Sequence, residues 1–178
     1  MNKKDLRKKY IAVRRKIAEK NSKEKIIIDK VLNLKQYKSA KKVGLYCAYN
    51  GEVNIDEIIK LSLDFNKIVA IPTVIDQHNM VFCRIKSLDE LNKLNMYGIR
   101  ETNTYDLVDN FDLIIVPGIV FDVNKNRIGY GKGYYDNYLR INKAYKLGVC
   151  FQEQIIDNIC IDKSDIKLDK VITDKTEM

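Results

Sequence analysis

A glycine-rich stretch between a predicted strand and a predicted helix constrains this chain more than any other feature. Residues 127–136 read RIGYGKGYYD, with glycines at alternate positions 129, 131 and 133. We call residues 129–133 the glycine loop. The apolar run at 112–117 predicts a buried strand before it, and residues 136–141 predict the body of a helix after it. Such a loop lets several backbone N–H groups point at one place, at the positive end of the helix dipole.

The residues alone allow two interpretations of this loop. Arg127 and Lys132 add full positive charges to the helix dipole, and that combination suits a polyphosphate. Glycines at a strand-to-helix turn can also serve the turn geometry alone. The stretch has no Gly-Lys-Ser/Thr, so it is not a Walker loop, and its GxGxG spacing differs from the GxGxxG of a dinucleotide fingerprint.

Predicted strands alternate with predicted helices, which favours a layered α/β sheet in a single domain spanning residues 1–178. The turn at 76–79 is expected to expose His78, and residues 95–110 carry no predicted element. Strands are predicted over residues 43–49, 68–72, 80–85, 112–117, 146–151 and 168–173, and helices over 3–20, 21–34, 55–65 and 136–141, with short helical segments at 87–90 and 153–159.

Three local signals refine this outline. Asn21 and Glu24 match the first and last positions of a capping box, which predicts a helix start at Asn21. The second strand is expected to end at Pro72, which cannot donate to a sheet ladder. Residues 37–42 are expected to form a polar connection.

Composition indicates a globular protein of the cytoplasm. Hydrophobic residues make up 46% of the chain, yet no apolar run approaches the length of a membrane span, and the charged N-terminus lacks the apolar region of a signal peptide. No two of the four cysteines form a CxxC pair, which argues against zinc and favours reduced, buried thiols.

Positive charge is concentrated at the N-terminus. The net charge of +8 divides into +12 within residues 1–42 and −4 over the remainder. This basic helical segment suggests an anionic partner, or it simply solvates two amphipathic helices. Lys3 and Arg7 are four residues apart, so both lie on one side of the first helix, either in solvent or directed at one anion.

Glu52 is a further candidate for a ligand-binding group. It follows the turn Asn50-Gly51 and precedes a predicted helix, so it lies near the carboxyl end of the first predicted strand. Ligand groups collect at that edge in open α/β sheets. The alternative is a loop carboxylate in solvent.

Over nearly its whole length, the chain resembles the family of 5-formyltetrahydrofolate cyclo-ligase, also called methenyltetrahydrofolate synthetase. The resemblance is strongest in VPGIVFD at residues 116–122 followed by RIGYGKGYYD at 127–136. Weaker matches occur in the same order as in the family: Lys3-x-x-x-Arg7 with Arg14, Glu52-Val53, Ala70-Ile-Pro72, and Asp165-x-x-x-Asp169-x-Val171.

The resemblance implies a three-layer α/β/α sandwich like that of ribose-phosphate isomerases and CoA transferases. It implies an ATP- and Mg²⁺-dependent cyclisation of 5-formyltetrahydrofolate to 5,10-methenyltetrahydrofolate, with release of ADP and phosphate. The formyl oxygen would be phosphorylated on the way. The expected partners are these small molecules, with no nucleic acid and no membrane, and the expected state is a monomer.

Roles for individual residues follow from the resemblance by position. Lys132 and Arg127 would be catalytic, and Asp136 and Asp165 would bind Mg²⁺. The folate would contact Glu52, Cys47 and Tyr134. The ATP-binding residues would be Lys3, Arg7, Arg127, Ile128, Gly129, Tyr130, Gly131, Lys132, Gly133, Tyr134 and Tyr135.

The chain departs from the family pattern at three places. Lys125 stands between two asparagines where a glycine is usual, Ala48 replaces a common proline beside the folate site, and Ser164 stands where a His is often found. Ala48 and residues 95–110 leave open a different substrate on the same fold and ATP site.

A second alternative is a basic nucleic-acid-binding protein that uses the N-terminal segment and the aromatic residues around the glycine loop. Asp136, Asp165 and Glu52 argue against it, because three carboxylates in one site repel a phosphodiester backbone. Tyr134 and Tyr135 are predicted to pack on a ligand ring or, alternatively, within the helix.

Overall fold

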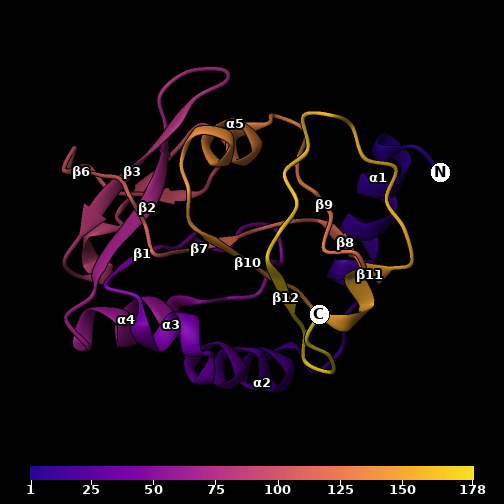
Figure 1. Cartoon of the computed structure of the whole chain (residues 1–178), viewed down its shortest axis with the longest axis horizontal. Helices are drawn as coiled ribbons and strands as arrows, with labels where there is room; N and C mark the ends of the chain where they lie inside the picture. The colour runs from indigo at the N-terminus through magenta and orange to yellow at the C-terminus, as the bar shows by residue number, and fades with distance from the viewer.

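The computed structural model describes residues 1–178. A seven-stranded sheet crosses the centre of the molecule (Figure 1). The first five strands in the order below run parallel, the sixth is antiparallel to the fifth, and the seventh is antiparallel to the sixth. In order across the sheet they are β12 (Lys170–Ile172), β10 (Tyr145–Val149), β7 (Leu113–Val116), β1 (Lys42–Gly44), β2 (Ile68–Val74), β3 (Met80–Ile85) and β6 (Leu107–Val108).

Helices cover both faces of this sheet, which confirms the predicted three-layer α/β/α arrangement. Helices α2 (Lys20–Asn33), α3 (Lys35–Ser39) and α4 (Asp56–Asp64) lie on one face, and α5 (Tyr134–Ile141) lies on the other (Figure 1). Side chains alternate along the central strand β7 accordingly. Leu113 and Ile115 join the core under α2–α4, and Ile114 and Val116 join the core under α5.

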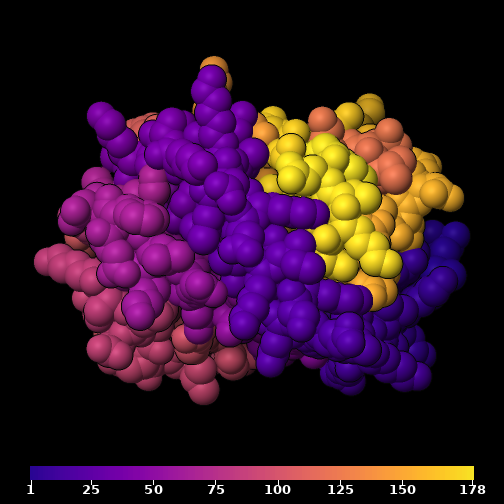
Figure 2. Space-filling model, turned by 90° about the horizontal axis from the view of Figure 1, so that it is seen from below, coloured from indigo at the N-terminus to yellow at the C-terminus, as the bar shows by residue number.

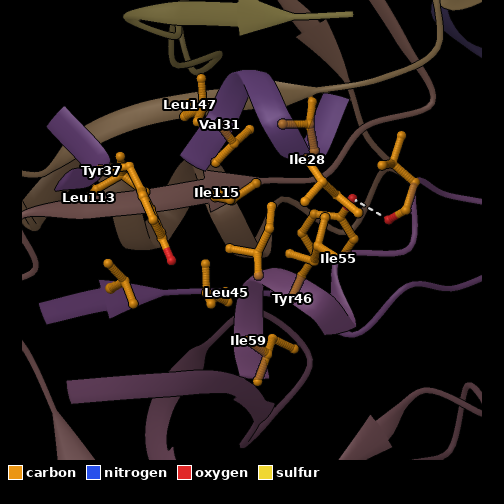
Figure 3. Close-up of a cluster of buried hydrophobic side chains, with 14 of the residues drawn as sticks. Ile28, Val31, Tyr37, Leu45, Tyr46, Ile55, Ile59, Leu113, Ile115 and Leu147 are labelled. Atoms are coloured by element: carbon orange, nitrogen blue, oxygen red, sulfur yellow. Dashed lines mark hydrogen bonds between the residues drawn. The ribbon is translucent and has the colours of Figure 1, made fainter. Parts of the chain in front are cut away.

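The larger core lies between the sheet and the helices α2 and α4. Figure 3 shows Ile28 and Val31 of α2 and Ile59 of α4 directed towards Leu45 and Ile115 of the sheet layer. These side chains are almost completely buried. Burying each one contributes on the order of 1.5–3 kcal/mol, so this face holds the central strands in place.

Helix α1 (Lys3–Arg15) packs away from the large sheet, against a small sheet. That sheet has the order β11 (Ile155–Ile156), β8 (Val120–Asp122) and β9 (Arg127–Ile128). Leu6 and Tyr10 of α1 are buried against Val120 and Ile128. Because β9 leads directly into the glycine loop, this packing brings the N-terminal helix to that loop.

Helix α2 lies beside the end of the chain. Figure 2 shows the N-terminal segment, in indigo and purple, spread across one face next to the C-terminal residues in yellow. Lys30 Nζ donates to the carbonyl oxygens of Thr173 and Asp174, over 2.8 and 3.2 Å. The basic segment is thus integrated into the fold.

None of the helices combines the length and the apolarity that a bilayer crossing needs.

Residues 95–110, which have no predicted element, contain short strands. Strand β5 (Arg100–Glu101) pairs with β4 (Lys93–Leu94) in a hairpin, and β6 lies at the edge of the large sheet. The 3₁₀ turn η1 (Leu88–Glu90) precedes the hairpin, as the helical prediction for 87–90 anticipates. His78 is exposed between β2 and β3, as predicted.

The predicted capping box is wrong. Helix α2 begins at Lys20 after Glu19, whose φ is 54°, so Asn21 lies inside the helix. Glu24 instead accepts a hydrogen bond of 2.9 Å from the backbone N–H of Asn54. A tertiary partner therefore replaces the expected local one.

Other boundaries differ for similar reasons. β2 continues through Pro72 to Val74. The backbone of Ala70 faces β1, since its carbonyl oxygen accepts from the N–H of Leu45 over 3.0 Å. Pro72 lies two residues further on and faces the same side, but β1 has already ended there. No neighbouring strand there needs an N–H from Pro72. The connection at 37–42 contains the end of α3. The helical prediction for 153–159 is wrong, since the 3₁₀ turn η2 (Gln152–Gln154) gives way to β11.

Candidate active site

A cavity of about 680 Å³ lies at the carboxyl ends of β1, β2 and β7. Its other walls are α1, the glycine loop with the start of α5, and the β4–β5 hairpin. Clefts of this size hold small molecules and cofactors, and this edge of an open α/β sheet is where ligands bind.

Every residue predicted for the site lines this cavity, although the residues are spread from position 3 to position 165. They are Lys3, Arg7, Cys47, Glu52, Arg127, Ile128, Gly129, Tyr130, Gly131, Lys132, Gly133, Tyr134, Tyr135, Asp136 and Asp165.

The glycine loop approaches α1 closely. Arg7 Nε donates to the carbonyl oxygen of Gly129 over 2.8 Å. A Cβ added at Gly131, where φ is +93°, would lie 3.1 Å from Arg7 Cζ, so only glycine fits without displacing the guanidinium. Gly133 has φ 76° and is the N-cap of α5. Lys132 lies exposed between these two glycines and forms no ion pair, which leaves its charge available to a ligand.

Arg127 and Tyr135 present two unused donors inside the cavity wall. Arg127 is 7% exposed; its Nη2 donates to Asp136 Oδ1 over 3.2 Å, and its Cζ lies 5.7 Å from the centre of the Tyr135 ring. Its Nε and the Tyr135 hydroxyl are buried with no hydrogen-bond partner. Burial raises the pKa of Tyr135, so this hydroxyl is a neutral donor. Buried donors without acceptors cost roughly 1–3 kcal/mol each, and a bound oxygen ligand removes that cost.

Three carboxylates line the cavity near Lys3 and Arg127. Lys3 Nζ contacts Asp162 Oδ2 at 2.6 Å and Asp165 Oδ2 at 2.5 Å. Asp136 Oδ1 accepts from Arg127 and, over 3.1 Å, from the N–H of Ile166. Oδ2 of Asp136 and Oδ1 of Asp165 accept no hydrogen bond from the protein, so each aspartate keeps one free oxygen.

These aspartates fit one particular mode of Mg²⁺ binding. The structure contains no group of three or more His, Cys, Asp or Glu side chains that could hold a metal ion by itself. Mg²⁺ is usually bound through one or two carboxylates and completed by substrate phosphates and water. Asp136 and Asp165 therefore suit an ion that arrives with a polyphosphate.

Glu52 is a buried carboxylate, which excludes the alternative of a loop residue in solvent. It is 8% exposed; its Oε2 accepts from the N–H of Tyr49 over 3.0 Å, and its Oε1 lies 3.8 Å from Nη1 of Arg14. Burial raises the pKa of Glu52 to about 7, against the opposing effects of the Arg14 charge and the Tyr49 N–H. Such a carboxylate is suited to accept hydrogen bonds from a ligand that enters the cavity.

Cys47 and Tyr134 contribute to the walls. Burial raises the pKa of Cys47 to about 12, so it is a neutral thiol and not a nucleophile. The Tyr134 hydroxyl donates to the carbonyl oxygen of Asp76 over 3.3 Å and lies 3.3 Å from the Tyr97 hydroxyl. Tyr134 thereby connects α5 to the β4–β5 hairpin.

Several residues at the cavity have no predicted role from sequence. Arg14, buried beside Glu52, carries a detectable signal, since it is seven residues after Arg7 and lies on the same helical face. Arg100 and Glu101 of the hairpin line the cavity, and Arg100 Nη2 contacts Asp56 Oδ1 at 2.6 Å. Nothing in the sequence locates this hairpin at the site, because only tertiary packing brings it there.

The fold and the cavity define an α/β protein that binds small-molecule ligands at the carboxyl edge of a mostly parallel sheet, between a cationic glycine loop and a buried carboxylate. Comparison with known proteins agrees. Residues 1–174 match the model of the 5-formyltetrahydrofolate cyclo-ligase family. The chain therefore belongs to this family, whose members are ligases.

Individual relatives show how close the similarity is. The chain is 34% identical to the probable 5-formyltetrahydrofolate cyclo-ligase of Schizosaccharomyces pombe, over 83% of this chain and 81% of the relative. It is 33% identical to the 5-formyltetrahydrofolate cyclo-ligase of Mus musculus, over 83% and 80%. The structure of the 5,10-methenyltetrahydrofolate synthetase of Aquifex aeolicus superimposes with a TM-score of 0.87 at 32% identity, over 99% of this chain and 92% of that one.

Proposed function

We propose that this protein closes 5-formyltetrahydrofolate to 5,10-methenyltetrahydrofolate, and that it consumes ATP with Mg²⁺ and releases ADP and phosphate. Membership of the cyclo-ligase family supports the cyclo-ligase activity itself. The use of ATP and the folate contacts are supported by one observation: a single cavity is lined both by the cationic glycine loop and by the buried carboxylate of Glu52.

The chemistry explains why such a site is needed. A formamide oxygen is a poor leaving group. In the proposed reaction the formyl oxygen attacks the γ-phosphorus of ATP, the bond to the β-phosphate oxygen breaks, and ADP leaves. The neighbouring anilino nitrogen then adds to the activated formyl carbon, loses its proton, and displaces the oxygen as phosphate. This sequence needs positioning and charge neutralisation more than acid–base catalysis.

The nucleotide half of the site supplies positive charge. Lys132 is free of ion pairs and projects from the glycine loop, where it can follow the transferring phosphoryl group. Arg7 and Lys3 reach the same loop from α1. Arg127 and Tyr135 offer the two unpartnered donors to an oxygen that becomes negatively charged.

Asp136 and Asp165 would hold Mg²⁺ through their free carboxylate oxygens. Bound there, the ion would neutralise phosphate charge and help to orient the polyphosphate. Lys3 contacts Asp165, so it lies at the junction of the metal ligands and the phosphates.

The folate half of the site contains Glu52, Cys47 and Tyr134. Glu52 can accept two hydrogen bonds from the adjacent amide and amino groups of a pterin. The apolar side chains Ile71, Val74 and Met80 also line the cavity and suit flat aromatic rings.

Cys47, Cys83 and Cys150 are buried as predicted, whereas Cys160 is exposed, so the prediction of buried thiols is wrong for Cys160. Four free thiols support a reducing, cytoplasmic location. The monomeric state stays a prediction.

A steady-state assay tests the proposal. Purified protein, Mg–ATP and 5-formyltetrahydrofolate are mixed, and methenyl product is followed by absorbance alongside ADP. Product and ADP in equal amounts would support both the substrate and the phosphoryl route. ADP without product would retain the ATP site and reject the folate. The variant Glu52→Gln is assayed alongside the wild type, because it is expected to weaken folate binding and to leave ATP binding unchanged.

Neither product nor ADP, with a working positive control, would reject the proposed activity. Binding of a labelled RNA by the same preparation would then favour the nucleic-acid alternative. The carboxylates Glu52, Asp136 and Asp165 in the cavity argue against that outcome, because they repel a phosphodiester backbone.

A further inference from the structure

Arg14 is a completely buried cation that does not itself line the cavity but contacts Asn50, Glu52 and Tyr130, which do. Its relative exposure is 0%, and each guanidinium nitrogen contacts a different segment. Nε donates to the carbonyl oxygen of Asn50 over 3.0 Å, Nη1 to the carbonyl oxygen of Gly118 over 3.2 Å, and Nη2 to the hydroxyl of Tyr130 over 2.5 Å. The guanidinium is therefore held in one orientation by the turn before Glu52, by the end of β7 and by the glycine loop.

The charge of Arg14 has one acidic partner. Glu52 Oε1 lies 3.8 Å from Nη1, and Arg14 forms no other ion pair. At that separation the two groups attract without a direct hydrogen bond, so Oε1 remains free to meet a ligand, while Oε2 accepts from the N–H of Tyr49. Burying a cation without a counter-charge costs folding free energy, so the charges of Arg14 and Glu52 stabilise each other.

Arg14 also shares a helix with the residues assigned to the nucleotide. Lys3, Arg7 and Arg14 all belong to α1, and the first two line the cavity beside the glycine loop. Tyr130, which accepts from Arg14, is part of that loop. One rigid helix thus contacts both halves of the cavity.

We infer that Arg14 is a positioning residue that maintains Glu52 as a charged, correctly oriented acceptor for the folate and connects it to the glycine loop through Tyr130. This inference rests on the proposed function, since it assigns Glu52 to the folate. No role in the reaction itself is assigned to Arg14, which does not reach the reacting atoms.

The groups that face Glu52 support this assignment. They are Arg14 from α1, Tyr46 after β1, Tyr130 of the glycine loop and Tyr135 of α5. Burial raises the pKa of all three tyrosines, to about 12 for Tyr130, so they are neutral near pH 7. Arg14 is the cation that lowers the pKa of Glu52, and its loss would leave the carboxyl mostly protonated at neutral pH.

The test is a double-mutant cycle of Arg14→Gln and Glu52→Gln, with Arg14→Lys as the conservative variant. Arg15→Gln is the matched control, because Arg15 is the adjacent exposed cation and contacts only the Asn50 side chain. Equilibrium dissociation constants for 5-formyltetrahydrofolate and for ATP are measured with the full-length protein from about pH 6 to pH 9. The double variant, which removes both buried charges, completes the cycle. If Arg14→Gln alone fails to fold, Arg14→Lys, which keeps the charge and changes its geometry, is compared with the wild type instead.

For the wild type, folate affinity is expected to fall as the pH drops below about 7, where Glu52 becomes protonated. Arg14→Gln should move that fall to higher pH and weaken folate binding on the order of tenfold at pH 6, since a rise of about one pKa unit lowers the ionised fraction tenfold at pH values below both pKa values. Arg14→Lys should restore part of the affinity, and Arg15→Gln should behave as wild type. In the Glu52→Gln background, Arg14→Gln should have little further effect on folate binding.

An unchanged pH profile in Arg14→Gln, or an equal loss of affinity in both Glu52 backgrounds, would overturn the inference. Carboxyl NMR titration of Glu52 without ligand separates this result from failure of the proposed function. If the wild type binds no folate, the proposed function falls. The NMR titration still tests whether Arg14 controls the charge of Glu52, because the inference requires the pKa of Glu52 to be higher in Arg14→Gln than in the wild type.

Discussion

Arg7 donates from Nε to the carbonyl oxygen of Gly129 over 2.8 Å, across 122 positions of sequence. The contact joins the first helix to the glycine loop, and it is possible because Gly131 has no side chain to occupy the place of the guanidinium. Helix α1 of the N-terminal basic segment is therefore a wall of the site and not a separate arm. This relationship supports the use of Lys3 and Arg7 as phosphate-binding groups.

Gly131→Ala is predicted to raise the KM for ATP about tenfold, because its Cβ would displace the Arg7 guanidinium from the loop. Backbone strain at positive φ adds a stability cost of about 1 kcal/mol. Gly98→Ala is the matched control: Gly98 has φ +79° and no atom within 4 Å of an added Cβ, so it carries the strain alone. Equal ATP KM values for the two variants would show that the Arg7 contact has no role in nucleotide binding.

Lys132→Ala is predicted to lower kcat by on the order of 10²–10³, the scale for losing one donor that stabilises charge in the transition state. Stability should hardly change, since Lys132 is exposed and forms no ion pair. Steady-state kinetics with saturating ATP and folate, beside Lys143→Ala as an exposed control lysine, measures the effect. Near-normal turnover would remove Lys132 from the reaction.

Asp136→Asn and Asp165→Asn are predicted to raise the Mg²⁺ concentration for half-maximal activity by at least about tenfold. Each variant removes one of two proposed carboxylate ligands, and a neutral amide oxygen is a poorer ligand for Mg²⁺. Titration of activity with Mg²⁺ at fixed ATP reports the change, with Asp157→Asn on the surface as the control. A Mg²⁺ dependence identical to that of the wild type would show that these aspartates do not bind the ion.

Tyr135→Phe is predicted to leave the unliganded protein as stable as the wild type or more stable by about 1 kcal/mol, since it deletes a buried hydroxyl with no partner. The same change should lower kcat, because the bound substrates lose a hydrogen bond. Urea denaturation and steady-state kinetics on one preparation test both effects. A destabilised variant with unchanged kcat would indicate that the hydroxyl has a structural partner instead.

Glu52→Gln is predicted to stabilise the unliganded protein above pH 7 by about 3 kcal/mol, at 1.36 kcal/mol for each pKa unit. This is a net figure, because the raised pKa already includes the attraction of Arg14, which is smaller than the cost of burying the carboxylate. The folded protein raises the pKa of Glu52 from 4.5 to about 7, so it favours the protonated form. That contribution to stability is complete below pH 4.5 and is lost as the pH rises through 7. Glutamine imitates the protonated carboxyl at every pH.

Urea unfolding at pH 5 and pH 8 checks this sign. The variant should gain stability over the wild type mainly at pH 8, while Glu57→Gln, an exposed control on α4, should show no such difference. A gain that is equal at both pH values would mean that the charge of Glu52 is not the cause. The predicted gain is the stability that the wild type gives up to keep Glu52 charged, which is the form that the proposed function uses.

Much of the architecture can be derived from the sequence, since the relevant signals are local. Alternation of apolar strands with amphipathic helices predicts the α/β layers, and the order of strands and helices agrees with the structure in most places. The glycine loop between β9 and α5 is found where the glycines lie, because left-handed backbone at Gly131 and Gly133 requires them. The family motifs also locate the residues that line the cavity.

The local predictions that are wrong have one cause in common. Glu24 contacts Asn54 instead of capping its own helix, and β2 passes Pro72 because β1 ends before it. In both cases a partner distant in sequence decides the outcome. Propensity and capping patterns describe only neighbours along the chain, so they cannot anticipate such partners.

The sequence by itself determined the layers, the glycine loop and the identity of the charged groups at the site. Only the tertiary structure decided the electrostatic state of those groups, because burial and distance set it. Glu52 has a pKa of about 7 because the fold removes it from water and places Arg14 beside it. The sequence places Arg14 on the same helical face as Arg7, but only the packing of α1 on the glycine loop makes it a buried counter-charge.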